Sequence, residues 1–406
     1  VALQIVLLFH KTFLRFVNFY TFPTKTNWEI YRQQRNLKTK IRIKSMNDYF
    51  HNKCDNGPNQ NEFWQTIKPF LSNKGHTDNE IILLHNDDLV SSPAEVANVL
   101  NDFYINVATN IGNNTSRDLA DFSNSDFVSK SIEMYNDHPS VQNIKEHGNY
   151  SPFAFKEVNQ DDICKLISQL DEKKATGYDT ISAKLLKLSV NHISKPVSQI
   201  INSSIVQCTF PQACKPAVVN PAYKKKDPRY RSNYRPISIL TAVSKVIEKV
   251  YNAQLNPFLH QILSEFVAAF RQHYSCQSAL LRLVEDWKKS LDKREFIGTI
   301  LMDLSKAFDC IPHDLLTAKL HAYGMTNDSI QLLASYLRNR KQQVRVGNTF
   351  SNWAFLTKGV PQGSILGPAI FNIFINDLYF TITKASLVNF ADDNTIFTSG
   401  KNLEDR

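Results

Sequence analysis

The chain has 406 residues, of which 42% are hydrophobic, 11% aromatic and 21% charged. This composition excludes collagen-like, low-complexity and wholly disordered proteins, and the length suits two or three domains. The net charge of +9 is concentrated in two segments: residues 1–44 carry nine basic and one acidic side chain, and residues 215–251 carry nine and two. Such a distribution favours a polyanionic partner such as nucleic acid over a diffuse basic surface.

The first residues and the cysteines bear on the cellular compartment. The apolar start is interrupted by polar and charged residues, among them Lys11 and Arg15, and it falls short of the roughly 18 uninterrupted apolar residues of a membrane span. We therefore expect neither an anchor nor a signal peptide, and we expect the chain, which starts at Val1, to be a fragment of a longer product. The six cysteines form no zinc-binding spacing, which favours reduced thiols in an intracellular protein.

The first 150 residues are predicted to be mostly helical. Residues 25–50 lack Gly and Pro and carry aromatic and basic side chains at spacings of three and four. This pattern predicts a basic helix, either solvated or in contact with nucleic acid. A short helix is expected over 93–105. Weak periodicity over 106–150 makes that segment the candidate linker, so residues 1–150 are expected to form a region separate from 151–406.

The remaining sequence predicts both helices and strands. Helices are predicted over 157–170, 183–193, 241–263 and 275–293, over a segment that begins near Pro312, and over 368–378. Residues 216–240 predict a short strand, a basic loop and an extended segment around Arg235-Pro236. Two hairpins are expected, one across Gly347-Asn348 and one over 386–399 with acids at its tip. Residues 296–304 are apolar apart from Thr299 and Asp303, which predicts a strand buried between layers.

Acidic residues at the ends of these strands are the first candidates for chemistry. Asp303 ends the apolar strand, and Asp392-Asp393 lie at the hairpin tip. Burial of such charges is costly unless a cation compensates them. Two divalent ions held by carboxylates on adjacent strands support phosphoryl or nucleotidyl transfer, and hard oxygen ligands suit Mg²⁺. Taken alone, Asp-Asp-Asn is also a common turn.

The chain has only 12 glycines, yet Gly359, Gly363 and Gly367 fall close together. Their spacing mimics a membrane-helix dimer motif, which Pro361, Gln362 and the lack of a long apolar segment exclude. A P-loop is excluded because Gly-Lys-Ser/Thr is missing. An ordinary turn remains an alternative, although it explains three glycines less easily than one or two.

Several blocks then follow one another in a characteristic order. They are KKATGYDTISAKLLK, NYRPISIL, FIGTILMDLSKAFDCIPHDLL, GVPQGSILGPAIFNIFINDL and NFADDNTIF. Over residues 155–406 these blocks resemble the signature blocks of reverse transcriptases from non-LTR retrotransposons of the jockey-like kind. WEIYRQQRN and FWQTIKPFL resemble the region that precedes the polymerase domain in that group. The resemblance implies an α+β fold, a right-hand polymerase core with helical fingers and an incomplete antiparallel-sheet palm, after an N-terminal, mostly helical extension.

The resemblance assigns catalytic roles to the acids. Asp303 corresponds to the palm aspartate that binds both metals, with the backbone carbonyl of Leu304 as an additional ligand. Asp392 corresponds to the second metal ligand, and Asp393 is the neighbouring acid of the same block. The residue before the acids, Ala391, is consistent with the non-LTR branch.

The resemblance also assigns nucleotide-binding roles to cations of the basic loop. Arg235 and one of Lys224, Lys225 and Lys226 match the fingers cations that grip the triphosphate, in agreement with the phosphate preference of Arg and Lys. Which lysine does so stays open. Without the resemblance, the lysine run is equally consistent with a solvated loop.

Three further residues are implicated near the base pair and the sugar. Phe308 matches the aromatic residue that lies under the sugar of the incoming nucleotide and excludes a 2′-OH, so the product is expected to be DNA. Gln362 and Gly363 match the block that lies along the template and the nascent base pair. We therefore expect Gly363→Val to damage polymerisation more than folding, by crowding the template. Asp309 and His313 fit the block without an assigned mechanism, and a capping or packing role is expected for them.

The function implied is RNA-directed DNA polymerisation with two Mg²⁺ ions, an RNA template, a DNA primer and dNTPs. A ribonucleoprotein in the cytoplasm and the nucleus, without membrane contact, is the implied setting. The chain ends 13 residues after Asp393, so primer grip and thumb are expected to be missing, and the fragment alone can be inactive. The alternative is a non-catalytic, nucleic-acid-binding remnant of a truncated or domesticated element. A two-metal nuclease is a poorer alternative, because it has no role for Phe308 or the fingers cations.

Overall fold

The computed structural model describes residues 24–54, 81–110, 122–148 and 150–401. The apolar start and the FWQTIKPFL stretch lie outside these ranges. Contacts divide the chain into two compact units, Val1–Asn79 and Glu80–Arg406. In the first unit the structure describes α2 (Lys25–Cys54), which confirms the predicted basic helix. None of the described helices is long and apolar enough to span a bilayer.

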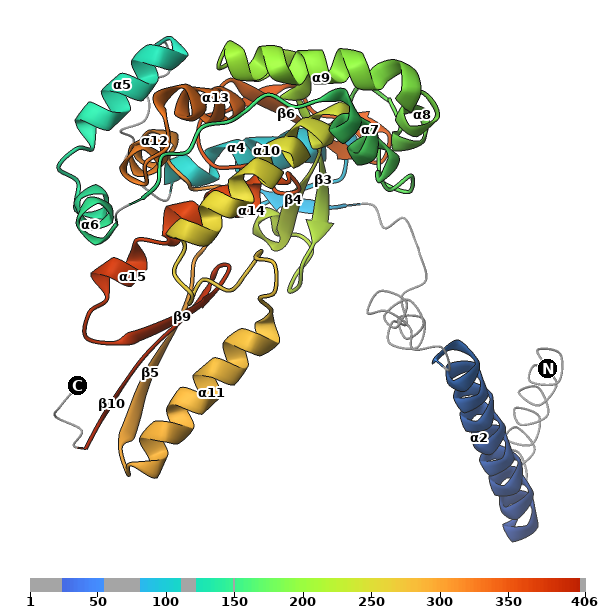
Figure 1. Cartoon of the computed structure of the whole chain (residues 1–406). Helices are drawn as coiled ribbons and strands as arrows, with labels where there is room; N and C mark the ends of the chain where they lie inside the picture. Colours follow the sequence, from blue (N-terminus) through green and yellow to red (C-terminus); the bar gives the residue numbers. More distant parts are fainter. Residues whose placement is uncertain (1–23, 55–80, 111–121, 149, 402–406) are drawn as a thin grey trace. The chain divides into compact units, whose positions relative to one another are not determined.

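Helices account for more of the described second unit than strands do (Figure 1). They are α4 (Pro93–Asn110), α5 (Asn124–Met134), α6 (Pro139–His147), α7 (Gln160–Ser168), α8 (Ala183–Leu188), α9 (Val190–Val206), α10 (Ala242–Ile262), α11 (Cys276–Asp292), α12 (His313–Ala322), α13 (Asn327–Leu337), α14 (Leu366–Ile375) and α15 (Leu378–Thr381). The predicted helix over 183–193 is therefore the short α8 and the start of α9. The other helices predicted after residue 150 are confirmed with small shifts at their ends.

The described strands of this unit form three sheets. The strands are β1 (Leu83–His85), β2 (Asp88–Val90), β3 (Ala217–Tyr223), β4 (Tyr234–Ile239), β5 (Phe296–Asp303), β6 (Arg340–Val346), β7 (Thr349–Phe350), β8 (Ala354–Leu356), β9 (Ser386–Phe390) and β10 (Asp393–Gly400). β1 and β2 form a hairpin, β4-β3-β6-β7 form a second sheet with β8 beside β6, and β5-β10-β9 form the third. Only the pairing of β3 with β6 is parallel among these described strands. The combination of helices with largely antiparallel sheets confirms the α+β class.

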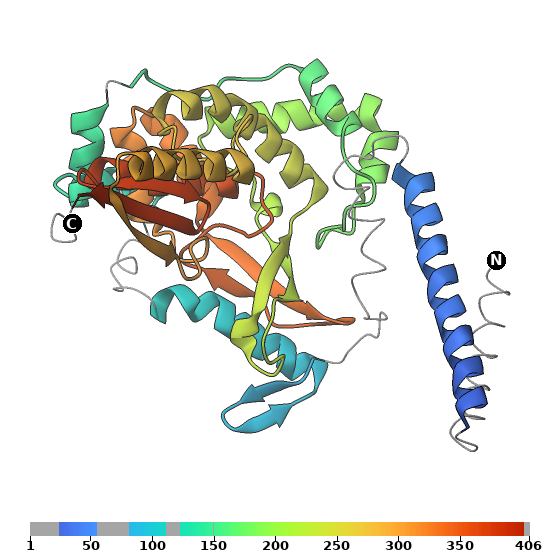
Figure 2. The same ribbon diagram turned by 90° about the horizontal axis from the view of Figure 1, so that it is seen from below.

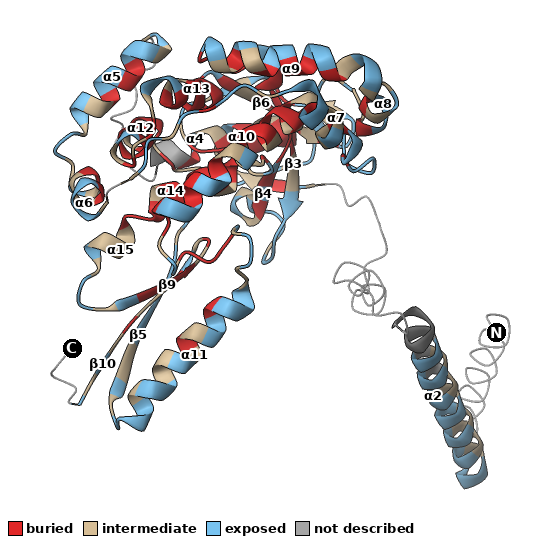
Figure 3. Cartoon of the chain, in the orientation of Figure 1, coloured by how far each residue is buried: buried red, intermediate tan, exposed pale blue. Residues whose placement is uncertain are grey.

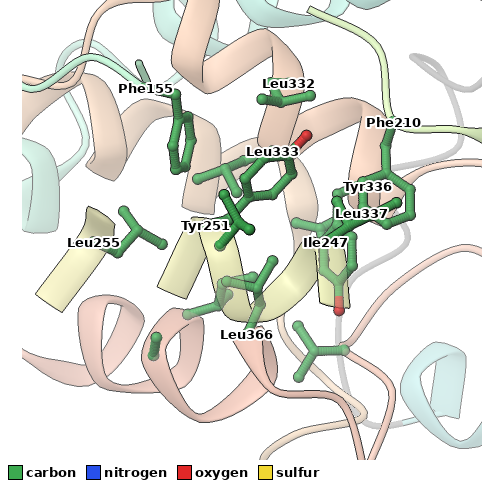
Figure 4. Packing of buried hydrophobic residues seen from close by; sticks show 14 of the residues in the cluster. Phe155, Phe210, Ile247, Tyr251, Leu255, Leu332, Leu333, Tyr336, Leu337 and Leu366 are labelled. Atoms are coloured by element: carbon green, nitrogen blue, oxygen red, sulfur yellow. The ribbon is translucent and has the colours of Figure 1, made fainter. Parts of the chain in front are cut away.

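The largest core lies among the helices of the second unit. Tyr251 of α10 is fully buried there, and its hydroxyl is 3.0 Å from the Ser204 hydroxyl. Figure 4 shows Tyr251 between Phe155, Leu333 and Leu255. Close packing of such side chains gives the elements around the site a rigid base.

The segment predicted to be a linker is structured in its described part, 122–148. Its two helices, α5 and α6, pack on α12, and α5 also packs on α13. The Ser123 hydroxyl caps α5 by accepting from the backbone of Asp126, and Arg338 donates to the carbonyl oxygen of Phe122 at 2.8 Å. Helices this short bury few residues, so their sequence periodicity is weak although tertiary contacts hold them in place.

The N-terminal end of the second unit has a small core of its own. Leu83 and Leu100 pack there with Val219 and Val344 of the second sheet. Figure 2 shows the β1–β2 hairpin and α4, both in blue-green colours, at one side of the unit. The compact unit therefore starts upstream of the boundary expected near residue 150.

The strand predicted over 296–304 forms as β5, but it is not buried. Ile300 and Leu301 are 61% and 77% exposed. β5 is an edge strand of its sheet, and α11 contacts it on one side, where Ile297 joins a small core with Leu283. Figure 3, coloured by burial, shows exposed and intermediate residues along β5 and α11, whereas α10 contains many buried residues. Continuous apolar character alone did not reveal that this strand has a free face.

Candidate active site

A cleft of about 580 Å³ lies where the loop after β3, the end of β5 and the β9–β10 hairpin meet. All site residues predicted from the sequence line it, except Asp393 and Gly363. These lining residues are Lys224, Lys225, Arg235, Asp303, Leu304, Phe308, Gln362 and Asp392. Segments separated by more than 160 residues in the chain therefore contribute to one cavity, with acids and cations in the same space.

The three acids gather at one end of the β5-β10-β9 sheet. Asp303, the last residue of β5, pairs in register with Asp393, the first residue of β10. Residues directly opposite on an antiparallel pair have their Cβ atoms about 4.5–5.5 Å apart. Asp392 lies in the two-residue turn, where its carbonyl oxygen accepts a 3.1 Å hydrogen bond from the Leu304 backbone N–H. The turn and the strand end are thus joined directly.

The exposure of these acids changes the argument for a metal. Asp303 and Asp393 are exposed and Asp392 is half-buried, so desolvation does not by itself require a compensating cation. Adjacent like charges do favour one, because their mutual repulsion is costly. Among the described residues, no group of three or more His, Cys, Asp or Glu forms a metal-binding cluster. Two carboxylates and a carbonyl oxygen are nevertheless hard ligands that suit Mg²⁺ when substrate phosphates complete its shell.

Two asparagines that the sequence interpretation missed brace the turn. The Asn389 side-chain amide donates to the carbonyl oxygen of Ala391 at 2.7 Å and to the Asn394 side-chain oxygen at 2.9 Å. Asn394 in turn donates to the carbonyl oxygen of Asp392 at 3.2 Å. Ala391 has a φ of +58°, a conformation that costs an L-residue about 1–2 kcal/mol. The side-chain amides of Asn389 and Asn394 offset this strain and hold Asp392 toward the cleft. The presence of an asparagine on each side of the acids was the sequence signal that could have revealed this role.

Cations line the opposite part of the cleft. Lys224 follows β3, and its backbone N–H donates to the carbonyl oxygen of Asn233 at 2.9 Å, which closes the basic loop next to Arg235. The sequence interpretation missed Lys306, which is half-buried in the same cleft. Burial lowers the pKa of Lys306, Asp309 opposes this effect, and the charges of Lys224 and Arg235 lower the pKa further. Lys224, Arg235 and Lys306 thus line one cleft as a cluster of positive charge. The place of Lys306 between Asp303 and Phe308 was the available sequence signal.

Phe308 has a fixed position at the wall of the cleft. Its ring stacks on Phe371 of α14 with centroids 4.7 Å apart and an interplanar angle of 17°. The ring of Phe270 meets it edge-on at 6.1 Å. Aromatic pairs of this kind stabilise by about 0.5–1.5 kcal/mol beyond the burial of area. These two aromatic contacts therefore fix the orientation of the Phe308 ring.

The loop that contains the glycine cluster lies along residues 308–311. The Gly359 N–H donates to the carbonyl oxygen of Ile311 at 2.8 Å, and the Val360 N–H donates to that of Phe308 at 2.9 Å. A Cβ on Gly359 would lie 2.5 Å from the carbonyl oxygen of Asp309. Close approach of two protein backbones therefore requires this glycine.

For Gly363→Val we expected damage to polymerisation through crowding of the template, and the structure contradicts that physical reason. A Cβ on Gly363 would lie 2.5 Å from the carbonyl oxygen of Ser238, and the φ of Gly363 is +123°. The backbone N–H of Ser238 also donates to the carbonyl oxygen of Gln362 at 2.7 Å. A side chain at this position disturbs the protein's own backbone, so Gly363→Val damages folding directly.

Two buried groups anchor the ends of this loop. His313 bonds the carbonyl oxygen of Gly359 through Nε2 at 2.7 Å, and burial lowers its pKa, so the neutral ring acts as donor. This confirms the packing role expected for His313. The Glu248 carboxyl group accepts from the backbone N–H groups of Ile365 and Leu366 at 2.7 and 3.3 Å. It thereby caps the start of α14, a role that sequence analysis missed because Glu248 lies in the middle of α10.

The chain is similar in sequence to known polymerases of mobile elements. The sequence model of the family described as "Reverse transcriptase (RNA-dependent DNA polymerase)" matches residues 223–405. The chain is 30% identical over 260 residues to "Probable RNA-directed DNA polymerase from transposon BS" of Drosophila melanogaster, covering 60% of the chain and 28% of that protein. It is 29% identical over 251 residues to "RNA-directed DNA polymerase from mobile element jockey" of Drosophila funebris, covering 59% of the chain and 27% of that protein. The chain thus spans less than a third of the length of these curated relatives.

Proposed function

We propose that the chain, whose residues 223–405 match the sequence model of the reverse transcriptase family, is the polymerase part of a jockey-like non-LTR retrotransposon protein. Its reaction is the addition of dNTPs to a primer 3′-OH, directed by an RNA template. The observation that carries this proposal is the single cleft lined by Asp303 and Asp392 and by the cations Lys224, Arg235 and Lys306. Acids next to a cationic cluster suit a polyphosphate substrate that reacts at its α-phosphate.

The acidic end of the cleft has the ligand set for two Mg²⁺ ions. Asp303 and Asp392 would supply carboxylate oxygens, and the backbone carbonyl of Leu304 would supply a further oxygen. When bound, such ions lower the pKa of the attacking hydroxyl and stabilise the leaving pyrophosphate. Asp393, opposite Asp303 in the ladder, adds negative charge and favours cation binding. The braced turn holds Asp392 in position before substrate arrives.

The cationic cluster is proposed to bind the triphosphate. The Arg235 guanidinium can donate to two phosphate oxygens at once, whereas Lys224 and Lys225 act as point charges. Lys306 lines the same cleft and adds a further positive charge to this cluster. An anion that enters this cluster relieves repulsion among the cations.

Residues on the far wall are proposed to select the sugar and hold the base pair. Phe308, stacked on Phe371, leaves no room for a 2′-OH and so favours deoxynucleotides. Gln362 lines the cleft, and with Gly363 it is proposed to lie along the template and the nascent pair. The glycine's own contribution is to let this loop approach Ser238.

The wider architecture extends this proposal. The helices over 160–206 with the sheet of β3 and β4 would serve as fingers, and the β5-β10-β9 sheet as the palm, within a polymerase region over 151–406. The helical region over 1–150, with its basic helix α2, would precede it. The RNA template and the DNA primer are the proposed partners, in a ribonucleoprotein that forms in the cytoplasm and acts in the nucleus.

Primer extension on poly(rA)/oligo(dT) with Mg²⁺ tests the proposal. The full chain is expected to incorporate dTMP, and Asp303→Asn and Asp392→Asn are each expected to lower the rate at least about 100-fold, a loss of roughly 2.7 kcal/mol of transition-state stabilisation. The matched control is Asp292→Asn, an exposed acid at the end of α11, which should retain activity.

Two outcomes contradict a polymerase. One is inactivity of this chain together with inactivity of a version extended at its C-terminus, and the other is full activity in both aspartate variants. RNA binding that falls steeply with salt, without incorporation, would instead support a nucleic-acid-binding remnant.

A further inference from the structure

Asp309 is an acid beside the cleft that the proposed reaction does not use. It follows Phe308 in the chain and lines a small cavity behind the cleft together with Gln362 and Lys358. It is not among the residues that line the cleft itself. Gln362 is the residue that lines both the small cavity with Asp309 and the cleft of the proposed nucleotide site.

The contact between the two side chains determines how the amide is oriented. Gln362 Nε2 lies 2.9 Å from one carboxylate oxygen of Asp309 and 3.0 Å from the other. An ionised carboxylate has no hydrogen to donate. Only the NH₂ group of Gln362 can therefore face Asp309, since a flipped amide would place oxygen against oxygen. The amide oxygen of Gln362 is left on the side away from Asp309.

The backbones that carry the two residues are closely joined. The Asp309 N–H donates to the carbonyl oxygen of Lys306 at 2.9 Å, while Val360 bonds to Phe308 and Gly359 to Ile311. The carbonyl of Asp309 lies in van der Waals contact with the glycine at 359, where no Cβ would fit. Neither Asp309 nor Gln362 can move far without breaking these backbone hydrogen bonds, so the pair of side chains is preorganised.

The pKa of Asp309 is raised above its usual value, because burial outweighs the neighbouring groups that favour the ionised form. Burial raises the pKa of Asp309, while the hydrogen bond from Gln362 and the positive charge of Lys306 lower it. The other titratable groups that face it are Tyr104 of α4, whose pKa Asp309 raises, and Cys310. Lys306 is thus the cation that compensates Asp309.

We propose that Asp309 is a positioning residue that orients the Gln362 amide so that its oxygen is presented to the nucleotide cleft as a fixed hydrogen-bond acceptor. This inference rests on the proposed function, because the acceptor would recognise a donor group of the incoming nucleotide or of the nascent base pair. A charge-assisted hydrogen bond that holds a recognition group lowers the cost of ordering that group when the substrate binds.

A double-mutant cycle with nucleotide affinity as the readout tests the role of Asp309. KM for dTTP in primer extension and Kd for a fluorescent dTTP analogue with Mg²⁺ are measured in the parent, Asp309→Asn, Gln362→Ala and the double variant. Asp309→Asn is expected to raise both constants roughly tenfold, the equivalent of about 1.4 kcal/mol, with a small change in kcat. In the Gln362→Ala background the same substitution is expected to change them less than about twofold.

A reversed pair provides a second test that a merely structural role would not pass. Gln362→Glu places two carboxylates face to face and should weaken nucleotide binding. Adding Asp309→Asn to Gln362→Glu restores a donor opposite an acceptor, so it should recover part of the affinity. Thermal unfolding of each variant, with Asp292→Asn as the matched acid-to-amide control, separates these effects from loss of fold.

The outcomes distinguish the inference from the function beneath it. Equal effects of Asp309→Asn in both backgrounds, or no recovery in the reversed pair, overturn the positioning role while the polymerase proposal stands. A parent chain that neither binds dTTP nor extends a primer overturns the proposed function and this role together.

Discussion

Replacement of Gly363 by alanine tests why the glycine-rich loop has its sequence. The added Cβ would lie 2.5 Å from the carbonyl oxygen of Ser238, almost an ångström inside an ordinary C···O contact of about 3.3–3.6 Å. The φ of +123° adds backbone strain of about 1–3 kcal/mol for a residue with a side chain. Relief of the clash also stretches the 2.7 Å bond from Ser238 to Gln362. We expect a loss of about 2–4 kcal/mol in the free energy of unfolding.

Gly347→Ala is the matched control for this substitution. Gly347 also has a positive φ, +60°, but a Cβ there would meet no atom within 4 Å. Its replacement should cost only the strain of a left-handed alanine, about 1 kcal/mol. The difference between the two variants isolates the steric contact with Ser238.

Urea unfolding followed by far-UV circular dichroism measures both variants at one pH and salt concentration. Nucleotide binding is measured in parallel under conditions where each variant is folded. The reasoning is refuted if Gly363→Ala unfolds at the same urea concentration as Gly347→Ala. If it did so and still lost template-dependent synthesis, crowding of the template would be the better explanation.

Three more predictions concern the wall, the loop and the core. Phe308→Ala should raise incorporation of ribonucleotides relative to deoxynucleotides at least about tenfold, because the ring no longer occupies the 2′-OH position; competition between rNTP and dNTP in primer extension measures this ratio. His313 has a pKa below its usual 6.5 because it is buried, so its stabilising contribution is present above pH 6.5 and is lost as the pH falls through the folded-state pKa. His313→Gln should therefore flatten the decline of unfolding free energy between pH 7 and 5. Asp377→Ala should lower the free energy of unfolding by about 3–5 kcal/mol, because it leaves the charge of Lys319 buried without its partner. The two side chains are 2.6 Å apart and almost inaccessible to solvent. A change of less than about 1 kcal/mol in calorimetric unfolding would contradict this prediction.

Most secondary structure after residue 150 could be predicted from the sequence. α10, α11 and the hairpin around Gly347 were recognised because periodicity, capping residues and turn residues are local signals. The residues gathered in the cleft were also predictable, since each lies in a block with a recognisable order. α5 and α6 were not predicted, because short helices depend on tertiary contacts more than on their own pattern.

The sequence indicated which residues are important more readily than it indicated why each is required at its position. The glycine cluster was noticed at once, but its explanation lies in the backbones of Asp309 and Ser238, which come from other segments of the chain. The exposure of β5 was likewise missed, because an apolar run does not say how many neighbouring layers cover it.

The sequence by itself predicted most of the helices and strands after residue 150, the basic segments, and a set of acids and cations and one aromatic ring that line a single cleft. These features depend on residues within one turn or one hairpin. Only the tertiary structure decided that Gln362 is oriented by Asp309, that Lys306 joins the cationic cluster and that Glu248 caps α14. Each of these interactions depends on side-chain geometry between separate elements, which a linear pattern does not fix.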